Sequence, residues 1–358
     1  MSSSGKKVFV GLSGGVDSAV SAALLKEQGY NVTGVFIRVW QPEFLGCSQE
    51  EDERDAKRVA AHLGIPFMTL DAVEEYKTRV VDYLVREYES GRTPNPDIMC
   101  NKFVKFGVFF DTARKNGADF VATGHYVTIQ KSKIRSQNEH TKLALCMGKD
   151  ANKDQSYFLW TLTPEHLTHT LFPVGELEKS QVREKARALD LPNAEKKDSQ
   201  GLCFIGKLDM QEFLGHFIKS EEGNVINEQG GVIGHHPGAV FFTLGQRHGF
   251  TITEKTPDDT PYYVIKKNVT ENTLTVSHEP KESNALTENI LLHNTNWITS
   301  SPRKGETFQA RLRYRQGLFS VSIKQITDAT AELEFYEPQI APEGQSLVLY
   351  KGEECVGP

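Results

Sequence analysis

The chain has 358 residues, of which 38% are hydrophobic and 25% charged, and a formal net charge of −6 that on its own argues against a nucleic-acid partner. This length predicts two or three domains of ordinary globular composition, and no apolar run approaches the ~18 residues that a membrane-spanning helix needs. Five cysteines, an odd number, argue against a disulfide framework, and an apolar strand already begins at Val8, so we expect a cytoplasmic protein without a signal peptide or membrane partner.

The first predicted element is a strand over residues 8–12, followed by a glycine-rich turn and a helix. The backbone N–H groups of such a turn and the helix dipole converge on one point, which suits a phosphate group. Glycine permits close approach, and Ser13 and Ser18 add hydroxyl donors. A Walker loop carries a lysine after its last glycine, but here Asp17 occupies that neighbourhood and calls for a cation such as Mg²⁺. The hexapeptide 13–18 resembles the PP-loop of ATP pyrophosphatases, which form AMP and pyrophosphate; the alternative is an ordinary turn between a strand and a helix.

Strands and helices alternate after this loop. The predicted strands cover residues 31–39, 65–70 and 119–123, and the predicted helices cover residues 50–63, 72–89 and 101–115. This alternation predicts an α/β fold with a doubly wound parallel sheet, in which ligands bind beyond the carboxyl ends of the strands. We therefore expect the phosphate loop, Ile37 and Gly124 to lie together at the edge formed by the carboxyl ends of the strands.

Two cysteines have the surroundings of reactive thiols. Cys100 is predicted to open a helix, where the dipole lowers the pKa of a thiol, and Lys102 and Lys105 add positive potential. Cys203 lies in a polar loop that runs into an apolar segment. Each of them alone is more often a small buried side chain than a catalytic group. The sequence contains no Cys-x-x-Cys pair, which argues against a zinc site and against an iron–sulfur cluster, so no resident metal site is predicted. The remaining cysteines are interpreted as structural: Cys47, Cys146 and Cys355.

The second half of the chain changes from helices to short strands. A polar excursion is expected at residues 131–141, and helices are predicted over residues 155–162, 164–171, 180–189 and 208–218. Strands are then predicted over residues 262–266, 273–277, 307–314, 319–326, 330–336 and 346–351, the last four as an antiparallel meander that forms a small barrel. We divide the chain into an ATP-binding and catalytic domain (1–210), a small central domain rich in β-structure (211–280) and a C-terminal β-barrel (281–358).

The predicted barrel carries a basic segment. Between residues 303 and 324, six residues are basic and one is acidic. Strand alternation in residues 309–315 places Arg311, Arg313 and Arg315 on one face, where the guanidinium groups could follow a phosphate backbone. A solvated antiparallel face is an equally good interpretation.

Several blocks together resemble the tRNA-specific 2-thiouridylases of the MnmA/TrmU type, within the PP-loop ATP pyrophosphatase superfamily. In chain order these blocks are residues 13–18, 95–102, 122–126, 152–159, 198–206, 244–247, 313–316 and 344–345. The resemblance implies that ATP with Mg²⁺ adenylates O2 of the wobble uridine, position 34, of tRNAs for Lys, Glu and Gln, and releases pyrophosphate. A persulfide donor, a cysteine desulfurase or a sulfur carrier protein, then supplies the sulfur of 2-thiouridine while AMP leaves.

The same resemblance implies roles for single residues. Cys203 would carry the persulfide, Cys100 would be the nucleophile, and a transient Cys100–Cys203 disulfide would remain for a reductant. Since the two cysteines are far apart in sequence, we expect the Cys203 loop to move to bring the sulfurs together. Asp97 is a candidate general base, with a helix N-cap as the alternative. The implied ATP-binding residues are Gly11, Leu12, Ser13, Gly14, Gly15, Val16, Asp17, Ser18, Ile37 and Gly124. The implied tRNA-binding residues are Asn95, Pro96, Asp97, His125, Lys153, Asp154, Gln155, Arg313, Tyr314 and Gln345, although His125 could instead be a core histidine.

Two other functions stay open at this point. A PP-loop ligase that adenylates a small molecule would leave Cys100, Cys203 and the basic segment without a purpose. A non-catalytic RNA-binding protein that holds ATP as a structural ligand would not release pyrophosphate in response to tRNA.

Overall fold

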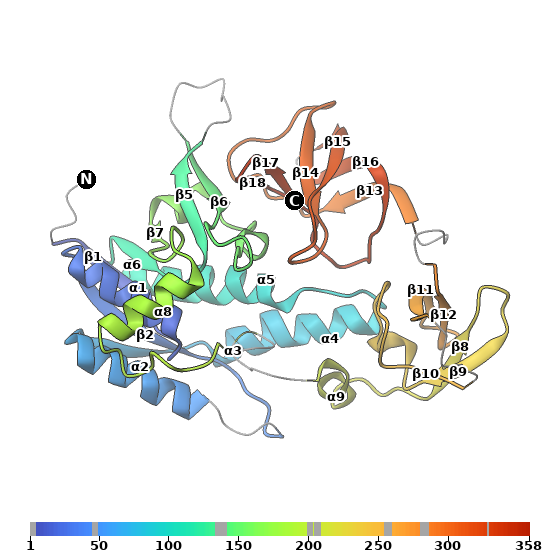
Figure 1. The fold of residues 1–358 in the computed structure, drawn as a ribbon, viewed down its shortest axis with the longest axis horizontal. Helices are drawn as coiled ribbons and strands as arrows, with labels where there is room; N and C mark the ends of the chain where they lie inside the picture. The colour runs from blue at the N-terminus through green and yellow to red at the C-terminus, as the bar shows by residue number, and fades with distance from the viewer. Residues whose placement is uncertain are drawn as a thin grey trace.

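The computed structural model describes residues 5–44, 49–132, 142–198, 203, 209–253, 260–279, 286–327 and 329–358. Cys47, most of the polar excursion and the neighbours of Cys203 in its loop lie outside the described residues. The described chain forms a parallel-sheet domain and two β-rich parts (Figure 1). None of its described helices is both long and apolar enough to cross a membrane.

The first domain is built on a parallel sheet, as the sequence predicts, and the sheet has five strands. The strand order is β3-β2-β1-β4-β7, and every neighbouring pair is parallel. The strands are β1 (Lys7–Gly11), β2 (Asn31–Arg38), β3 (Phe67–Asp71), β4 (Phe120–Ala122) and β7 (Thr170–Leu171). Strand β7 was not predicted: the helix expected over residues 164–171 is the shorter α7 (Pro164–Thr168), and the chain then pairs with β4.

Helices cover both faces of this sheet. One face packs against α1 (Val16–Glu27), α2 (Gln49–Leu63) and α8 (Lys179–Ala188). The other face packs against two long helical segments and α9 (Met210–Gly215). The first segment is α3 (Val73–Tyr76), η1 (Lys77–Val81) and α4 (Asp82–Glu89); the second is α5 (Pro96–Cys100), η2 (Asn101–Phe109) and α6 (Phe110–Lys115).

Two helix predictions need correction. The second helical segment begins at Pro96, one turn earlier than expected, because Asn95 caps it: its Oδ1 accepts from the backbone N–H groups of Asp97 and Ile98. Cys100 therefore lies inside a continuous helical segment and does not open a helix. The helix predicted over residues 155–162 is wrong as well, since only the 3₁₀ turn η3 (Ser156–Phe158) forms there.

The central part is a five-stranded sheet in the order β10-β9-β8-β12-β11. Its strands are β8 (Gly223–Ile226), β9 (Val232–His236), β10 (Thr251–Ile252), β11 (Tyr263–Asn268) and β12 (Thr273–Ser277), with the 3₁₀ turn η4 (Ala239–Phe241). Only the β8–β12 pair is parallel. The sheet encloses a small core of its own around Val225, Phe242 and Leu274.

The C-terminal part is antiparallel, as predicted, but its sheet includes two strands of the first domain. Its own strands are β13 (Leu286–His293), β14 (Thr307–Arg311), β15 (Phe319–Ile326), β16 (Thr330–Ile340), β17 (Val348–Lys351) and β18 (Glu354–Gly357). The hairpin β5 (Val127–Lys131) and β6 (Leu143–Met147) continues this sheet through the β18–β6 pair. The sheet thus ties the C-terminal part to the first domain, across a shared core that includes Leu145, Tyr157 and Tyr350.

Candidate active site

The phosphate loop lies at the point where the strand order of the sheet changes direction, next to the central strand β1. Strand β1 is central, with β2 on one side and β4 on the other, and the carboxyl ends of β1 and β4 lead into the loop and into Gly124 respectively. Such a switch point is where ligands bind in open α/β sheets. A Cβ at Gly124 would lie 2.8 Å from the backbone nitrogen of Ser18, and a Cβ at Gly14, whose φ is +75°, would lie 2.5 Å from the Asp52 oxygen. The two glycines therefore allow the loop to close against its neighbours.

Side chains around the loop hold its shape. Ser18 Oγ donates to the Gly15 oxygen at 3.0 Å and accepts from the Ser13 nitrogen at 3.2 Å. Asn193 Nδ2 donates to the Gly14 oxygen at 2.9 Å. The side chains of Leu12, Val16 and Ile37 are buried in the hydrophobic cores that flank the sheet, so only their backbone is available to a nucleotide. The structure thus brings the predicted ATP-binding residues 11–18 and Gly124 together, with Ile37 on the neighbouring strand.

A lysine that the sequence analysis missed reaches into this site. Lys179 Nζ contacts Asp17 Oδ1 and Oδ2 at 2.7 and 2.9 Å and Asp198 Oδ1 at 2.7 Å. The hydroxyl of Tyr126 donates to Asp17 Oδ1 at 2.7 Å. Burial acts to raise the pKa of Asp198, but the ammonium groups of Lys153 and Lys179 outweigh it and hold that pKa at about 2. No local signal marks Lys179, because it is 162 residues from Asp17.

The two predicted thiols lie in contact. The Sγ atoms of Cys100 and Cys203 are 3.4 Å apart, and both cysteines are free. The backbone of Cys203 is fixed on both sides: its N–H donates to Asp97 Oδ1 at 3.0 Å, and its carbonyl oxygen accepts from the Tyr76 hydroxyl at 2.8 Å. The expected loop movement is thus not needed to bring these sulfurs together in this conformation.

The environment gives the two thiols opposite protonation tendencies. Burial raises the pKa of Cys100 well above its usual value, and its S–H donates to Cys203. That hydrogen bond lowers the pKa of Cys203, and Lys105 lowers it further. The sequence analysis expected the lowered pKa at Cys100, which is wrong for this conformation because the residue is buried and lies inside a helix. Burial also raises the pKa of Asp97; because Asn95 is the N-cap, Asp97 is not.

His125 lies beside this pair as a buried residue. Its Nδ1 is 2.7 Å from Thr123 Oγ1, its Nε2 is 3.4 Å from Lys105 Nζ, and the ring packs near Phe106 and Phe172. Burial holds its pKa well below the usual value, so the ring is neutral. With 6% of its surface exposed and both nitrogens engaged, His125 fits the alternative of a core histidine.

Several predicted tRNA-binding residues lie at or beside the loop between α4 and α5. At this loop the first domain contacts both the central part and the C-terminal part. Thr93 Oγ1 is 3.0 Å from Thr243 Oγ1 of the central part. The Thr93 N–H donates to the Glu343 oxygen, and the Thr93 oxygen accepts from Gln345 Nε2 at 2.6 Å. Nearby Arg313 donates to the Leu244 oxygen. Gln345 and Arg313 thus lie at one junction, and residues 95–97 follow Thr93 closely in the chain.

The predicted row of three guanidinium groups is wrong. Strand β14 ends at Arg311, and Arg315 has a φ of +62°, so alternation does not continue. Arg311 is 9% exposed and points inward to Asp154 Oδ2 at 3.5 Å and over the Tyr350 ring. Arg313 is exposed, and the Arg315 guanidinium lies over the Tyr314 ring.

The three predicted contacts at residues 153–155 have different environments. Asp154 is 3% exposed and accepts from Gly148 and Ser156, so it has a structural role in this conformation. The Gln155 side chain accepts from the Tyr126 N–H at 3.0 Å. Lys153 is partly exposed and pairs with Asp198 at 2.8 Å, beside the phosphate loop network.

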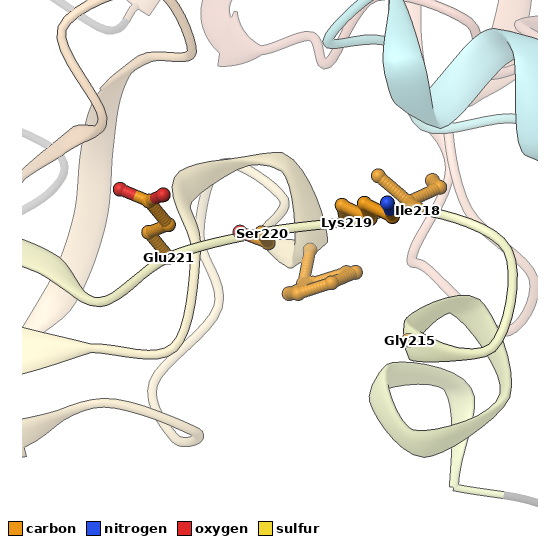
Figure 2. Close-up of a pocket in the computed structure, with 6 residues that line it drawn as sticks. Gly215, Ile218, Lys219, Ser220 and Glu221 are labelled. Carbon is orange, nitrogen blue, oxygen red and sulfur yellow. The ribbon is translucent and has the colours of Figure 1, made fainter.

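A separate open hollow of about 610 Å³ lies between α9 and the start of the central part (Figure 2). It is lined by Gly215, Ile218, Lys219, Ser220, Glu221 and Phe241. None of these is a predicted site residue. Within the described residues, no three His, Cys, Asp or Glu side chains lie close enough to hold a metal ion.

Comparison with known proteins gives matches along the whole chain. Three family profiles match, described as the tRNA methyl transferase HUP domain (residues 6–207), the tRNA methyl transferase PRC-barrel domain (211–278) and the aminomethyltransferase beta-barrel domain (287–358). A tRNA-specific 2-thiouridylase MnmA of Shewanella sp. (strain MR-4) is 43% identical, over 99% of this chain and 95% of its own length. The tRNA-specific 2-thiouridylase MnmA 2 of Aliarcobacter butzleri is 42% identical over 98% and 97%. The tRNA-specific 2-thiouridylase MnmA of Shigella boydii serotype 18 is 42% identical, over 100% of this chain and 97% of its own length.

Proposed function

Because the chain belongs to the family of tRNA-specific 2-thiouridylases, we propose that it converts the wobble uridine, position 34, of tRNA to 2-thiouridine at the expense of ATP. The observation that carries the proposal is the pair of sulfurs, 3.4 Å apart, in the same domain as a phosphate loop. Two thiols in contact suit sulfur transfer, which needs one thiol to carry sulfur and a second to release it. Methyl transfer, which the profile descriptions name, has no use for such a pair.

In the first step, uridine O2 attacks the α-phosphorus of ATP and pyrophosphate leaves. The backbone N–H groups of residues 13–16 and the start of α1 bind the phosphates. Lys179 supplies the positive charge that the loop itself lacks, and turns from Asp17 to the triphosphate when ATP binds. Mg²⁺ fits this site, because such ions are commonly held by one or two carboxylates together with phosphate oxygens. The Asp17 carboxylate would hold the ion, which would neutralise part of the phosphate charge. Asp97 is the candidate base for the N3 proton of the uridine, since a raised pKa suits proton acceptance.

In the second step, Cys203 accepts sulfur. The Cys203 thiolate attacks the outer sulfur of a donor persulfide, so that a new S–S bond forms on Cys203 and the donor leaves as its thiolate. The lowered pKa of Cys203 favours this role, because the thiolate is the nucleophile. A cysteine desulfurase or a sulfur carrier protein is the proposed donor.

In the third step, Cys100 releases that sulfur. The Cys100 thiol and the deprotonated Cys203 persulfide give a Cys100–Cys203 disulfide and hydrosulfide, which keeps the proton of Cys100. Hydrosulfide adds to C2 of the adenylated uridine, and AMP leaves with the former O2. A reductant supplies two electrons to reopen the disulfide. The short sulfur–sulfur distance supports this order, because the disulfide can form without displacing the helical segment that carries Cys100.

For tRNA, we propose contacts at the three-part junction and beside it: Asn95, Pro96, Gln345, Arg313 and Tyr314. A wobble base that is flipped out of the anticodon loop would pass from this junction toward Asp97 and the two thiols. Lys153 and Gln155 lie near the phosphate loop, where they could meet the same nucleotide. His125 and Asp154 could contact tRNA only after a rearrangement, because both are buried.

The test combines purified protein, ATP, a small-molecule persulfide and unmodified tRNA, followed by mass spectrometry of the nucleosides. We expect 2-thiouridine at position 34, and none with Cys100→Ser or Cys203→Ser, whereas Cys47→Ser stays active. Pyrophosphate release that does not depend on tRNA would favour a ligase for a small molecule. An absence of release with tRNA would favour a non-catalytic RNA-binding protein.

A further inference from the structure

Lys105 lies on the same side of its helix as Cys100. Residues 101–109 form a π-helix, whose hydrogen bonds join residues five apart, and Lys105 is five residues after Cys100. The π-helical turn therefore stacks the two side chains, which a regular α-helix would direct to different sides. Such segments are rare and occur frequently at functional sites.

The Lys105 ammonium lies beside the thiol pair and beside His125. Its positive charge lowers the pKa of Cys203, and its Nζ lies 3.4 Å from His125 Nε2. Because an ammonium group only donates, Nε2 must accept, so the neutral His125 ring carries its proton on Nδ1 and donates it to Thr123 Oγ1 at 2.7 Å. His125 thereby orients the lysine without competing for its charge.

We propose that Lys105 is a further catalytic residue of the sulfur-transfer steps, whose ammonium lies beside the Cys100–Cys203 pair and stabilises the Cys203 sulfur as the thiolate that takes sulfur from the donor. The inference rests on the proposed function. Lys105 keeps its proton throughout: the electron pair that attacks the donor comes from Cys203, and the pair of the broken S–S bond leaves with the donor. When hydrosulfide is released in the next step, the same ammonium lies beside the departing negative charge.

The other described groups around Cys203 do not supply the positive charge that a thiolate needs. Asp97 and the Tyr76 hydroxyl hold its backbone, and Cys100 donates one hydrogen bond to its sulfur. Burial and the Asp97 carboxylate both disfavour a thiolate at Cys203. The Lys105 ammonium acts against both of these effects, because it lowers the pKa of Cys203.

The test is the pH dependence of alkylation of Cys203 by iodoacetamide, followed by mass spectrometry of the Cys203 peptide. In Lys105→Met we expect at least tenfold slower alkylation at pH 7 and a midpoint at least one pH unit higher. Lys105→Arg should keep most of the wild-type rate, because the charge remains. Lys102→Met is the matched control, since Lys102 is exposed on the same helical segment, and it should behave as wild type.

A Lys105→Met protein that melts like the wild type and alkylates Cys203 with an unchanged midpoint overturns the inference. If the melting temperature of Lys105→Met falls, two other variants decide. Lys105→Arg keeps the charge, and His125→Gln removes the ring that orients the lysine. An unchanged midpoint in His125→Gln together with slow alkylation in Lys105→Arg also overturns the inference. The assay needs neither ATP nor tRNA, so its outcome is separate from the test of the proposed function. A shifted midpoint without thiouridine formation refutes the proposed function and leaves only the stabilisation of the Cys203 thiolate by Lys105.

Discussion

Replacing Lys179 by methionine tests whether this lysine, which comes from α8, binds the phosphates of ATP as the lysine of a Walker loop does. In the structure the Lys179 ammonium lies 2.7 Å from Asp17 Oδ1 and 2.7 Å from Asp198 Oδ1. Two unit charges at about 4 Å interact by about 4 kcal/mol at an effective dielectric constant of about 20. The side chains are 15% to 32% exposed, so solvent screening reduces the usable part to about 1–2 kcal/mol.

If this interaction passes from Asp17 to the triphosphate, Lys179→Met weakens ATP binding by about tenfold, because each 1.4 kcal/mol changes a dissociation constant tenfold. Isothermal titration calorimetry with a non-hydrolysable ATP analogue measures the change. Lys179→Arg should retain most of the affinity. The matched control is Lys185→Met, because Lys185 is exposed on the same helix. An affinity of Lys179→Met within twofold of the wild type refutes the reasoning.

Other single substitutions test the loop, a buried ion pair and the Asp198 network. Gly124→Ala should reduce tRNA-dependent pyrophosphate release at least tenfold, because the added Cβ would lie 2.8 Å from the phosphate-loop backbone. Gly215→Ala is the control and should keep the wild-type rate, because its Cβ would have nothing within 4 Å; equal rates for the two variants would contradict the prediction. Arg311→Met should lower the free energy of unfolding in urea by about 3–5 kcal/mol, because it leaves Asp154 buried and unpaired; a loss below about 1 kcal/mol would show that the pair is unimportant. The folded-state pKa of Asp198, about 2 against 3.8 in the unfolded chain, stabilises the protein above pH 4, and this contribution is lost as the pH falls from about 4 to 2. Asp198→Asn should therefore show a weaker dependence of melting temperature on pH over that window, and an unaltered dependence would count against the ion pairs.

The parts of the site that lie close together in sequence could be predicted. A strand, a glycine-rich turn and a helix within residues 7–27 follow from local composition, and the parallel sheet follows from the alternation of elements. Lys179 could not be predicted, because only the packing of α8 against α1 brings it to Asp17. The same holds for Tyr76, which reaches the Cys203 carbonyl from another helix.

The errors have identifiable physical causes. The hairpin β5–β6 was missed because its partner, β18, lies more than 200 residues later, so nothing local marks it as a sheet edge. The predicted row of arginines was wrong because strand β14 already ends at Arg311, and Arg315 takes a positive φ in the turn that follows. The lowered pKa expected at Cys100 was wrong because burial of its thiol, which raises the pKa, outweighs any effect of its position in the helix.

The central claim, that one adenylating pocket and one pair of thiols act on a single uridine, is tested most directly by a single turnover without reductant. Protein charged with one persulfide sulfur is mixed with ATP and unmodified tRNA, and the products are counted by mass spectrometry. The account predicts one 2-thiouridine, one AMP and one Cys100–Cys203 disulfide per chain, and no second turnover until both a reductant and a further persulfide donor are added. Thiouridine formed with Cys100 and Cys203 both still reduced, or a second turnover with the donor but without the reductant, would contradict it.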